Sequence, residues 1–183
     1  MIRSIASGMP GTRLPGANSM IRSIAFGIAA LPVAAAAQGA VETGKFGEWI
    51  LHQSDDGTHK ICFAATQPKE KDPPGANRAR TLLYVSAWPK EGVKSEVSFK
   101  LGYPIKVGSE VTVTIGKDAF RLFAKDERAF VADQTEELKL IDAMKKGSKL
   151  VVQATSERGT GTTDTYSLAG LAQALQAMAA SCP

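Results

Sequence analysis

The chain has 183 residues, an apolar fraction of 44% and 22 basic against 18 acidic residues. This ordinary globular composition excludes a collagen-like chain, a coiled coil and global disorder. Three of the 22 basic residues lie within residues 1–37, which contain no acidic residue, so residues 38–183 carry 19 basic and 18 acidic residues. A nearly neutral domain gives no support for a nucleic-acid partner, which would need basic residues clustered on the folded surface.

The N-terminal segment has the features of a secretory signal peptide. Arg22 precedes an uncharged apolar run, residues 24–37, and Ala35 and Ala37 form an A-x-A pattern that predicts cleavage before Gln38. The run is shorter than the roughly 20 apolar residues of a membrane span, and no later segment approaches that length. We therefore expect no transmembrane segment in the mature chain. The alternative is a buried N-terminal helix, although a glycine and a proline interrupt the run.

Residues 1–8 (MIRSIASG) and 20–27 (MIRSIAFG) match at seven of eight positions. Either a short segment is duplicated, or the sequence begins at an upstream start codon chosen in place of Met20. We favour Met20 as the effective start. The predicted organisation is an N-terminal extension and signal peptide at 1–37, followed by a single domain at 38–183. The expected location is the periplasm or the outer envelope, with the protein surface-associated or secreted as further options.

Most of the exported part shows the alternation of apolar and polar residues that is typical of strands with one face in a core. Val111, Val113 and Ile115 alternate with polar residues, for example, and Phe120, Leu122 and Ala124 continue the period. The expected strands are 46–53, 59–66, 80–88, 95–101, 110–115, the region of 120–124, 148–157 and 163–166, with a polar loop at 67–80.

Two helices interrupt this pattern. Asp133 resembles the start of a capping box that opens a helix over 134–146, and Gly147 closes it, with Leu138, Ile141 and Met144 on one side. Ser167 is the expected cap of a final helix that carries an apolar face of Leu168, Leu171, Leu175 and Met178. The predicted fold class is mainly β, an antiparallel β-sandwich or barrel-like domain with one internal helix and a C-terminal helix.

The two cysteines, Cys62 and Cys182, both lie in the exported part. An exported pair tends to form a disulfide, which would tie the final helix to the second strand, whereas the alternative is two unpaired buried thiols. The spacing excludes a C-x-x-C redox motif and a zinc knuckle.

No residue pattern marks a catalytic or metal site, and no phosphate-binding loop or G-x-S-x-G motif is present, so we expect no cofactor. His52 and His59 lie on either side of a turn and would face each other. We expect two exposed strand residues, and a metal site formed with Asp55 or Asp56 is the alternative. Spacing alone leaves a Ser-His-Asp triad open.

Each of two further sets of residues has two interpretations, one as a binding site and one without a binding role. The basic loop containing Lys69, Lys71, Arg78 and Arg80 would contact acidic lipid or polysaccharide, or would simply be solvated. Trp49 and Trp88 would form a binding platform, although core packing is the favoured interpretation.

Four places in the sequence carry a family resemblance: Phe46-Gly47-x-Trp49, Cys62-Phe63, residues 137–147 (ELKLIDAMKKG), and Arg158-Gly-Thr with 164–170 (DTYSLAG). Together they resemble the invasion-associated locus B family of exported proteobacterial proteins, over nearly all of 45–182. The resemblance implies a periplasmic or outer-envelope β-sandwich-like domain. Some members are linked to entry into host cells, notably erythrocytes. Many relatives have W-x-x-C where this chain has His52, which makes Cys62–Cys182 the only intrachain pairing.

We therefore expect an exported, non-enzymatic cell-envelope protein that acts by binding, with a role in host-cell invasion among the implied functions. Its partner and its oligomeric state are not determined by the sequence. The alternatives are a small periplasmic hydrolase, which would need a pocket with perturbed titratable groups, and an envelope assembly or stress factor, which would need an exposed sheet edge.

Overall fold

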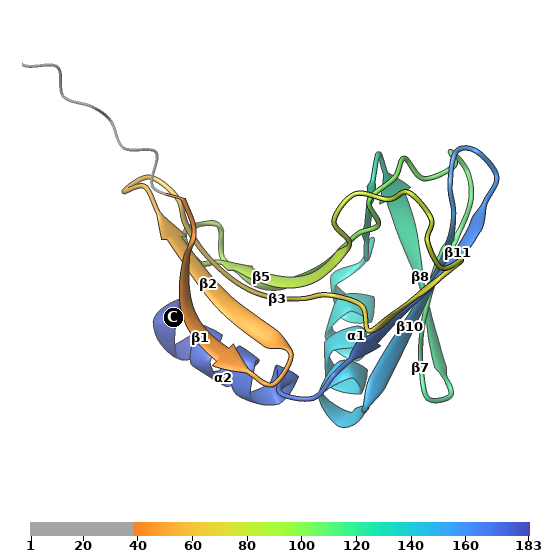
Figure 1. Cartoon of the computed structure of the whole chain (residues 1–183). Helices are drawn as coiled ribbons and strands as arrows, with labels where there is room; N and C mark the ends of the chain where they lie inside the picture. The colour runs from red at the N-terminus through yellow and green to blue at the C-terminus, as the bar shows by residue number, and fades with distance from the viewer. Residues whose placement is uncertain (1–38) are drawn as a thin grey trace, which may run out of the picture. The chain divides into compact units, whose positions relative to one another are not determined.

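The computed structural model of the chain describes residues 39–183 (Figure 1). The predicted signal peptide, its cleavage between Ala37 and Gln38, and the choice of Met20 as start all lie outside the described residues. The helices and strands follow in the order β1 Val41–Phe46, β2 Trp49–Asp55, β3 Lys60–Thr66, β4 Glu70–Asp72, β5 Leu82–Trp88, η1 Pro89–Glu91, β6 Val93–Lys100, β7 Val111–Ile115, β8 Asp118–Lys125, β9 Arg128–Phe130, α1 Gln134–Lys146, β10 Lys149–Thr155, β11 Gly161–Ser167 and α2 Leu171–Ser181.

The strands form one antiparallel sheet, which confirms the predicted mainly β class. The strand order is β1-β2-β3-β5-β6-β9-β8-β7-β10-β11-β4, so β1 and β4 are the edge strands. Neighbours in the sequence are mostly neighbours in the sheet, as the short turns between them favour. The order departs from the chain order where β4 crosses over to pair with β11. That crossover carries the basic loop 67–80 to the distant end of the sheet.

The alternating residues form the core as the sequence predicts. Val111, Val113 and Ile115 are buried, and so are Phe120 and Leu122 on the neighbouring strand β8. They belong to one contiguous cluster within the described residues, which also contains Trp49, Phe99, Leu140 and Tyr166. Because apolar residues at every second position of a strand share one face, burial of that face stabilises the pairing register as well as the strand. Trp49 is fully buried, whereas Trp88 is only half-buried.

Helix α1 has the predicted bounds and the predicted start. Asp133 is its N-cap, and the Asp133 carboxylate accepts hydrogen bonds from the backbone N–H groups of Thr135 and Glu136. The predicted face is wrong at Leu138, which is 58% exposed, because Leu140 takes its place beside Ile141 and Met144. Three-residue steps fall short of the 3.6-residue turn, so Leu138 drifts away from the face on which Leu140 and Met144 lie four residues apart.

Helix α2 packs on β1, β2 and β3, and it begins later than predicted (Figure 1). Ser167 is the last residue of β11, where it pairs with Lys149, so the prediction that Ser167 caps the helix is wrong. The N-cap is Gly170, with φ of 93°, and the Ser167 hydroxyl instead accepts a hydrogen bond from the N–H of Ala169 at 3.2 Å. Continued pairing with β10 keeps Ser167 extended, so the chain needs a turn before it becomes helical.

Three strands were missing from the predicted set. The edge strands β1 and β4 carry charged residues and no regular alternation, and β9 is too short to show a period. The predicted strand 46–53 runs across the β1–β2 turn, where Gly47 has φ of 59°. These strands are defined by pairing with a neighbour rather than by a buried face of their own.

Candidate functional site

The cysteine pair joins helix α2 to the sheet as the sequence predicts. Cys62 on β3 and Cys182 after α2 form a disulfide with their Cα atoms 6.2 Å apart. Lys60, two residues before Cys62, donates a hydrogen bond from Nζ to the carbonyl oxygen of Ser181 at 2.9 Å. The C-terminal end of α2 is therefore held both covalently and by a hydrogen bond to the carbonyl of its last residue.

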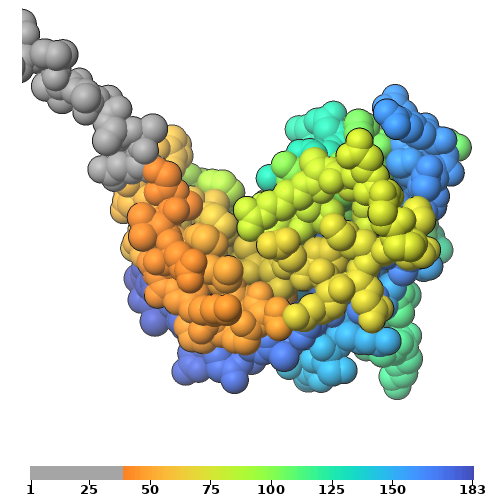
Figure 2. Space-filling view, viewed as in Figure 1, coloured from red at the N-terminus to blue at the C-terminus, as the bar shows by residue number. Residues whose placement is uncertain are grey.

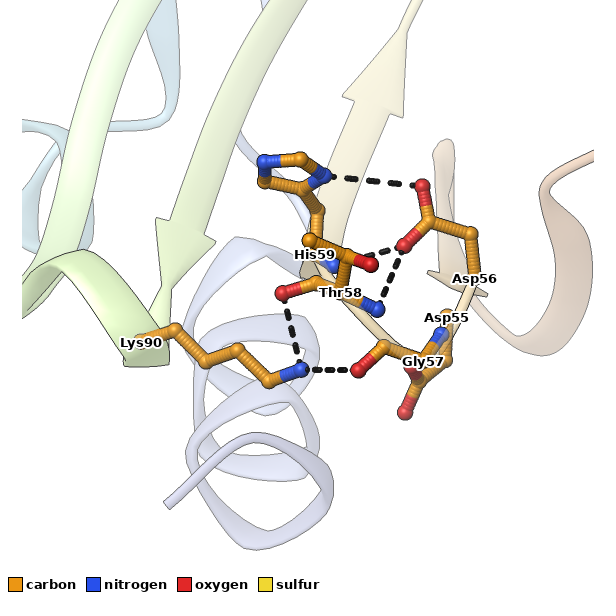
Figure 3. A network of polar contacts seen from close by, with 6 residues as sticks. All are labelled: Asp55, Asp56, Gly57, Thr58, His59 and Lys90. Atoms are coloured by element: carbon orange, nitrogen blue, oxygen red, sulfur yellow. Dashed lines mark hydrogen bonds and ion pairs between the residues drawn. The ribbon is translucent and has the colours of Figure 1, made fainter.

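The two histidines have different partners, so the expectation that they face each other is wrong. The His52 ring stacks on Phe63 with the ring centroids 4.9 Å apart. His59 Nδ1 lies 3.5 Å from a carboxylate oxygen of Asp56 (Figure 3). Among residues 39–183 no group of three His, Cys, Asp or Glu side chains is placed to hold a metal ion.

The turn around His59 is organised by hydrogen bonds to the backbone (Figure 3). Asp56 accepts from the N–H groups of His59 and Thr58, and these bonds lower the pKa of the Asp56 carboxyl. Lys90 donates from Nζ to the carbonyl oxygens of Gly57 at 2.6 Å and Thr58 at 2.8 Å. Every contact of this cluster stabilises the β2–β3 turn, which is a structural role.

The basic loop 67–80 does not form a single basic patch. Lys69 pairs with Glu48 at 2.7 Å, whereas Arg78 turns inward to Asp164 on β11. The Arg78 side chain is 4% exposed and that of Asp164 is 0% exposed. In Figure 2 this loop, in yellow, lies against the blue segment that contains β11, in keeping with the pairing of β4 and β11.

Arg78 of this buried pair also lines a pocket of about 400 Å³, which we call the Arg78 pocket. Four segments line it: Ala76, Asn77 and Arg78; Gly102, Tyr103 and Pro104; Ser156, Glu157 and Arg158; and Thr160 with Thr162. Arg158 and Asp164 both belong to one of the four places that carry the family resemblance, Arg158-Gly-Thr with 164–170. The fold brings Arg158 to the wall of this pocket, and Asp164 is the partner of Arg78, which also lines it. The sequence predicts that the loop of Arg78 contacts acidic lipid or polysaccharide or is solvated, and it assigns no binding role to Arg158.

The electrostatics of the pocket are dominated by burial. Burial raises the pKa of the Asp164 carboxyl, and the hydrogen bonds from Arg78 oppose that rise. Burial also raises the pKa of Tyr103, whose hydroxyl is hydrogen-bonded to that of Thr162, while the Arg78 guanidinium lies 5.8 Å from the Tyr103 ring centroid. Below them the Tyr166 hydroxyl is buried with no hydrogen-bond partner among the described residues, and burial raises its pKa well above the ordinary range.

This arrangement suits recognition of a polar ligand. Arg78 and Asp164 neutralise and orient each other, so they hold the walls in place and are not free to react. The exposed lining offers the amide of Asn77, the carboxylate of Glu157, the guanidinium of Arg158 and the hydroxyl of Thr160, which are groups that donate and accept hydrogen bonds. The pocket volume lies within the range of about 300–1,000 Å³ that is usual for small-molecule sites.

Comparison with known proteins places the chain in a family. The search of curated proteins found no match. The structure is similar to the crystal structure of invasion associated protein b from Bartonella henselae, with a TM-score of 0.56 and 19% sequence identity, over 75% of this chain and 96% of that chain. At that identity the likeness shows the fold. None of the described helices is long and apolar enough to cross a membrane. The family model described as Invasion associated locus B (IalB) protein matches residues 49–179, and the chain belongs to this family.

Proposed function

We propose that the protein is an exported, non-enzymatic cell-envelope protein that acts by binding, and that it binds its ligand in the Arg78 pocket. The observation that carries the proposal is the convergence of two distant parts of the chain on one hollow: Arg78, which is paired with the buried Asp164, and Arg158 both line it.

Two features of the pocket favour binding over hydrolysis. Neither His52 nor His59 lines it, so histidine, the most frequent general base, is missing from its described walls, and Glu157 is the one carboxylate among its lining residues. Arg78 and Asp164 are bonded to each other in a bidentate pair and the Asp164 side chain is 0% exposed, so this carboxylate is not free to act as a base or nucleophile. The lining therefore supplies orientation and hydrogen bonds.

The location and the biological role belong to the same proposal. The predicted signal peptide and the Cys62–Cys182 bond both support export into an oxidising compartment. The similar Bartonella henselae protein is named invasion associated, and we propose an interaction role of that kind for this chain. N-terminal sequencing of the protein from the envelope fraction tests export, with Gln38 as the expected first residue. A protein that begins upstream of Gln38, or that fractionates with the cytoplasm, would contradict it.

Photocrosslinking tests binding in the pocket. A photoreactive amino acid at Asn77, an exposed lining residue, should give a saturable adduct in the envelope, and Arg158→Ala should suppress it several-fold. The same amino acid at Gln176, exposed on α2, is the matched control and should give no such adduct. If the protein instead hydrolyses an ester, phosphate or glycan substrate and His59→Ala abolishes that activity without changing the melting temperature, the enzyme interpretation replaces this one.

A further inference from the structure

A second hollow, of about 490 Å³, lies between α1, α2 and the β5–β6 turn, and we call it the apolar groove. Its walls are aliphatic, with Val93 from β6, Leu138 and Ile141 from α1, and Leu175, Met178 and Ala179 from α2. Cys182 also borders it, so the disulfide fixes the helix that forms one wall. The Arg78 pocket shares no lining residue with this groove.

The size of the groove distinguishes a small ligand from a protein partner. The groove opens to the surface, and its volume of 490 Å³ and mainly aliphatic lining suit a small apolar ligand. The volume is in the usual range for a small-molecule site. A stable protein interface would instead bury about 800 Å² on each partner across a broad surface. Leu138, 58% exposed at the groove, is an apolar side chain that a ligand lying there would cover.

Two lysine side chains and the terminal carboxylate of Pro183 are the charged groups that border the groove. Lys94 and Lys145 are the only charged side chains that line it. Neither has a carboxylate within the 4.0 Å ion-pair distance in residues 39–183, whereas two other lysines of α1 are paired, Lys139 with Glu136 at 2.7 Å and Lys146 with Asp142 at 2.6 Å. A lysine can lay its methylene stem along an apolar wall and present its ammonium group at the rim.

We propose that the apolar groove binds a fatty acid, with the acyl chain along the aliphatic walls and the carboxylate held by Lys94 and Lys145. The aliphatic floor matches the acyl chain of such an amphiphile, and the two unpaired ammonium groups match its carboxylate. The site is independent of the Arg78 pocket, so either proposal can fail without the other.

Calorimetric titration of the purified protein, with its disulfide intact, tests the proposal with laurate below its micelle concentration. We expect saturable binding of one laurate per chain and a raised melting temperature, because a ligand that binds only the folded state stabilises it. Each buried methylene is worth roughly fourfold in affinity, so laurate, with two more methylenes, should bind about fifteenfold more tightly than decanoate. Methyl laurate, which has the same chain and no charge, should bind more weakly than laurate.

Matched variants locate the site. Ala179→Trp should fill the groove and abolish binding, whereas Ala180→Trp, at the next exposed position of α2 and outside the groove, should not. Lys145→Ala should weaken laurate roughly two- to fivefold with little effect on methyl laurate, and Lys146→Ala should leave both unchanged. The proposal is overturned if affinity is independent of chain length, if the two tryptophan variants bind alike, or if only anionic vesicles and no monomeric fatty acid bind.

Discussion

Arg78 and Asp164, 86 residues apart, are joined by two hydrogen bonds, from Nη1 to Oδ2 at 3.0 Å and from Nη2 to Oδ1 at 2.6 Å. The bidentate geometry is the strongest form of this contact, and both side chains are almost completely buried. The pair fastens the loop 67–80 to β11, beside the short pairing of β4 with the same strand. The charge pair therefore helps to hold one wall of the Arg78 pocket, together with the backbone hydrogen bond from Ala79 to Gly102.

Breaking that pair should be strongly destabilising. We expect Arg78→Met to lower the free energy of unfolding by about 3–5 kcal/mol, because Asp164 would remain buried without its partner. The double variant Arg78→Met/Asp164→Leu should lose less than Arg78→Met alone, since neither charge is then buried. Urea denaturation of the single and double variants measures both quantities, and additive losses would contradict a coupled pair.

Tyr166 should make the protein sensitive to alkaline pH. Its pKa is raised by burial, so above about pH 10 the unfolded chain loses a phenol proton that the folded chain keeps. The stability that the protonated Tyr166 contributes is fully present below about pH 10 and is lost as the pH rises further. Tyr166→Phe should flatten this decline and, by removing a hydroxyl with no described partner, raise the free energy of unfolding at pH 7 by about 1 kcal/mol. Urea denaturation between pH 7 and 11 measures it, and an unchanged alkaline slope would contradict the assignment.

The two residues with the sequence features of helix caps should differ when replaced. Asp133→Ala should cost about 1 kcal/mol, because Asp133 accepts two backbone hydrogen bonds at the start of α1, and Asp133→Ser should retain most of the stability. Ser167→Ala should cost less than about 0.5 kcal/mol, since Ser167 is not the cap of α2. Thermal denaturation of the three variants measures the difference. Equal losses for Asp133→Ala and Ser167→Ala would contradict the observed helix starts.

Gly170 should be intolerant of any side chain. It has φ of 93°, and a Cβ atom at this position would meet the backbone carbonyl of Phe46. We expect Gly170→Ala to cost more than about 3 kcal/mol, because neither strand β1 nor the start of α2 can move without disturbing the other. Gly159→Ala is the matched control, with φ of 85° and open space around the site, and should cost about 1 kcal/mol from backbone strain alone. Similar melting temperatures for the two variants would show that the close approach of Gly170 to the backbone of Phe46 does not add to the cost of a side chain.

The disulfide should be a major source of stability. The Cys62→Ala/Cys182→Ala variant should lose about 4 kcal/mol, because the bond closes a loop with a sequence separation of 120 residues and restricts the unfolded chain. Reduction of the unaltered protein should produce the same loss, which urea denaturation with and without a thiol reductant measures. Two thiols that react with an alkylating reagent in the native, unreduced protein would contradict the pairing.

The sequence by itself determined the features that depend on local periodicity and composition. Alternation in 110–115 predicted β7 and its buried face, Asp133 and Gly147 predicted both ends of α1, and the presence of only two cysteines predicted the Cys62–Cys182 bond. The strand and helix predictions held because a residue's burial on one face of a strand or helix, or its fit to a cap, is decided within a few positions along the chain. The disulfide prediction held because two cysteines allow only one intrachain pair.

Only the tertiary structure decided which distant residues meet. Arg78 reads as one more charge in a polar loop until the crossover of β4 carries it to Asp164, and β9 exists only through pairing with β6 and β8. Ser167 has the residue type of a cap, but its pairing with Lys149 keeps it in a strand. The strand order fixes all three, and that order follows from burial summed over the whole sheet, which no local window of the sequence contains.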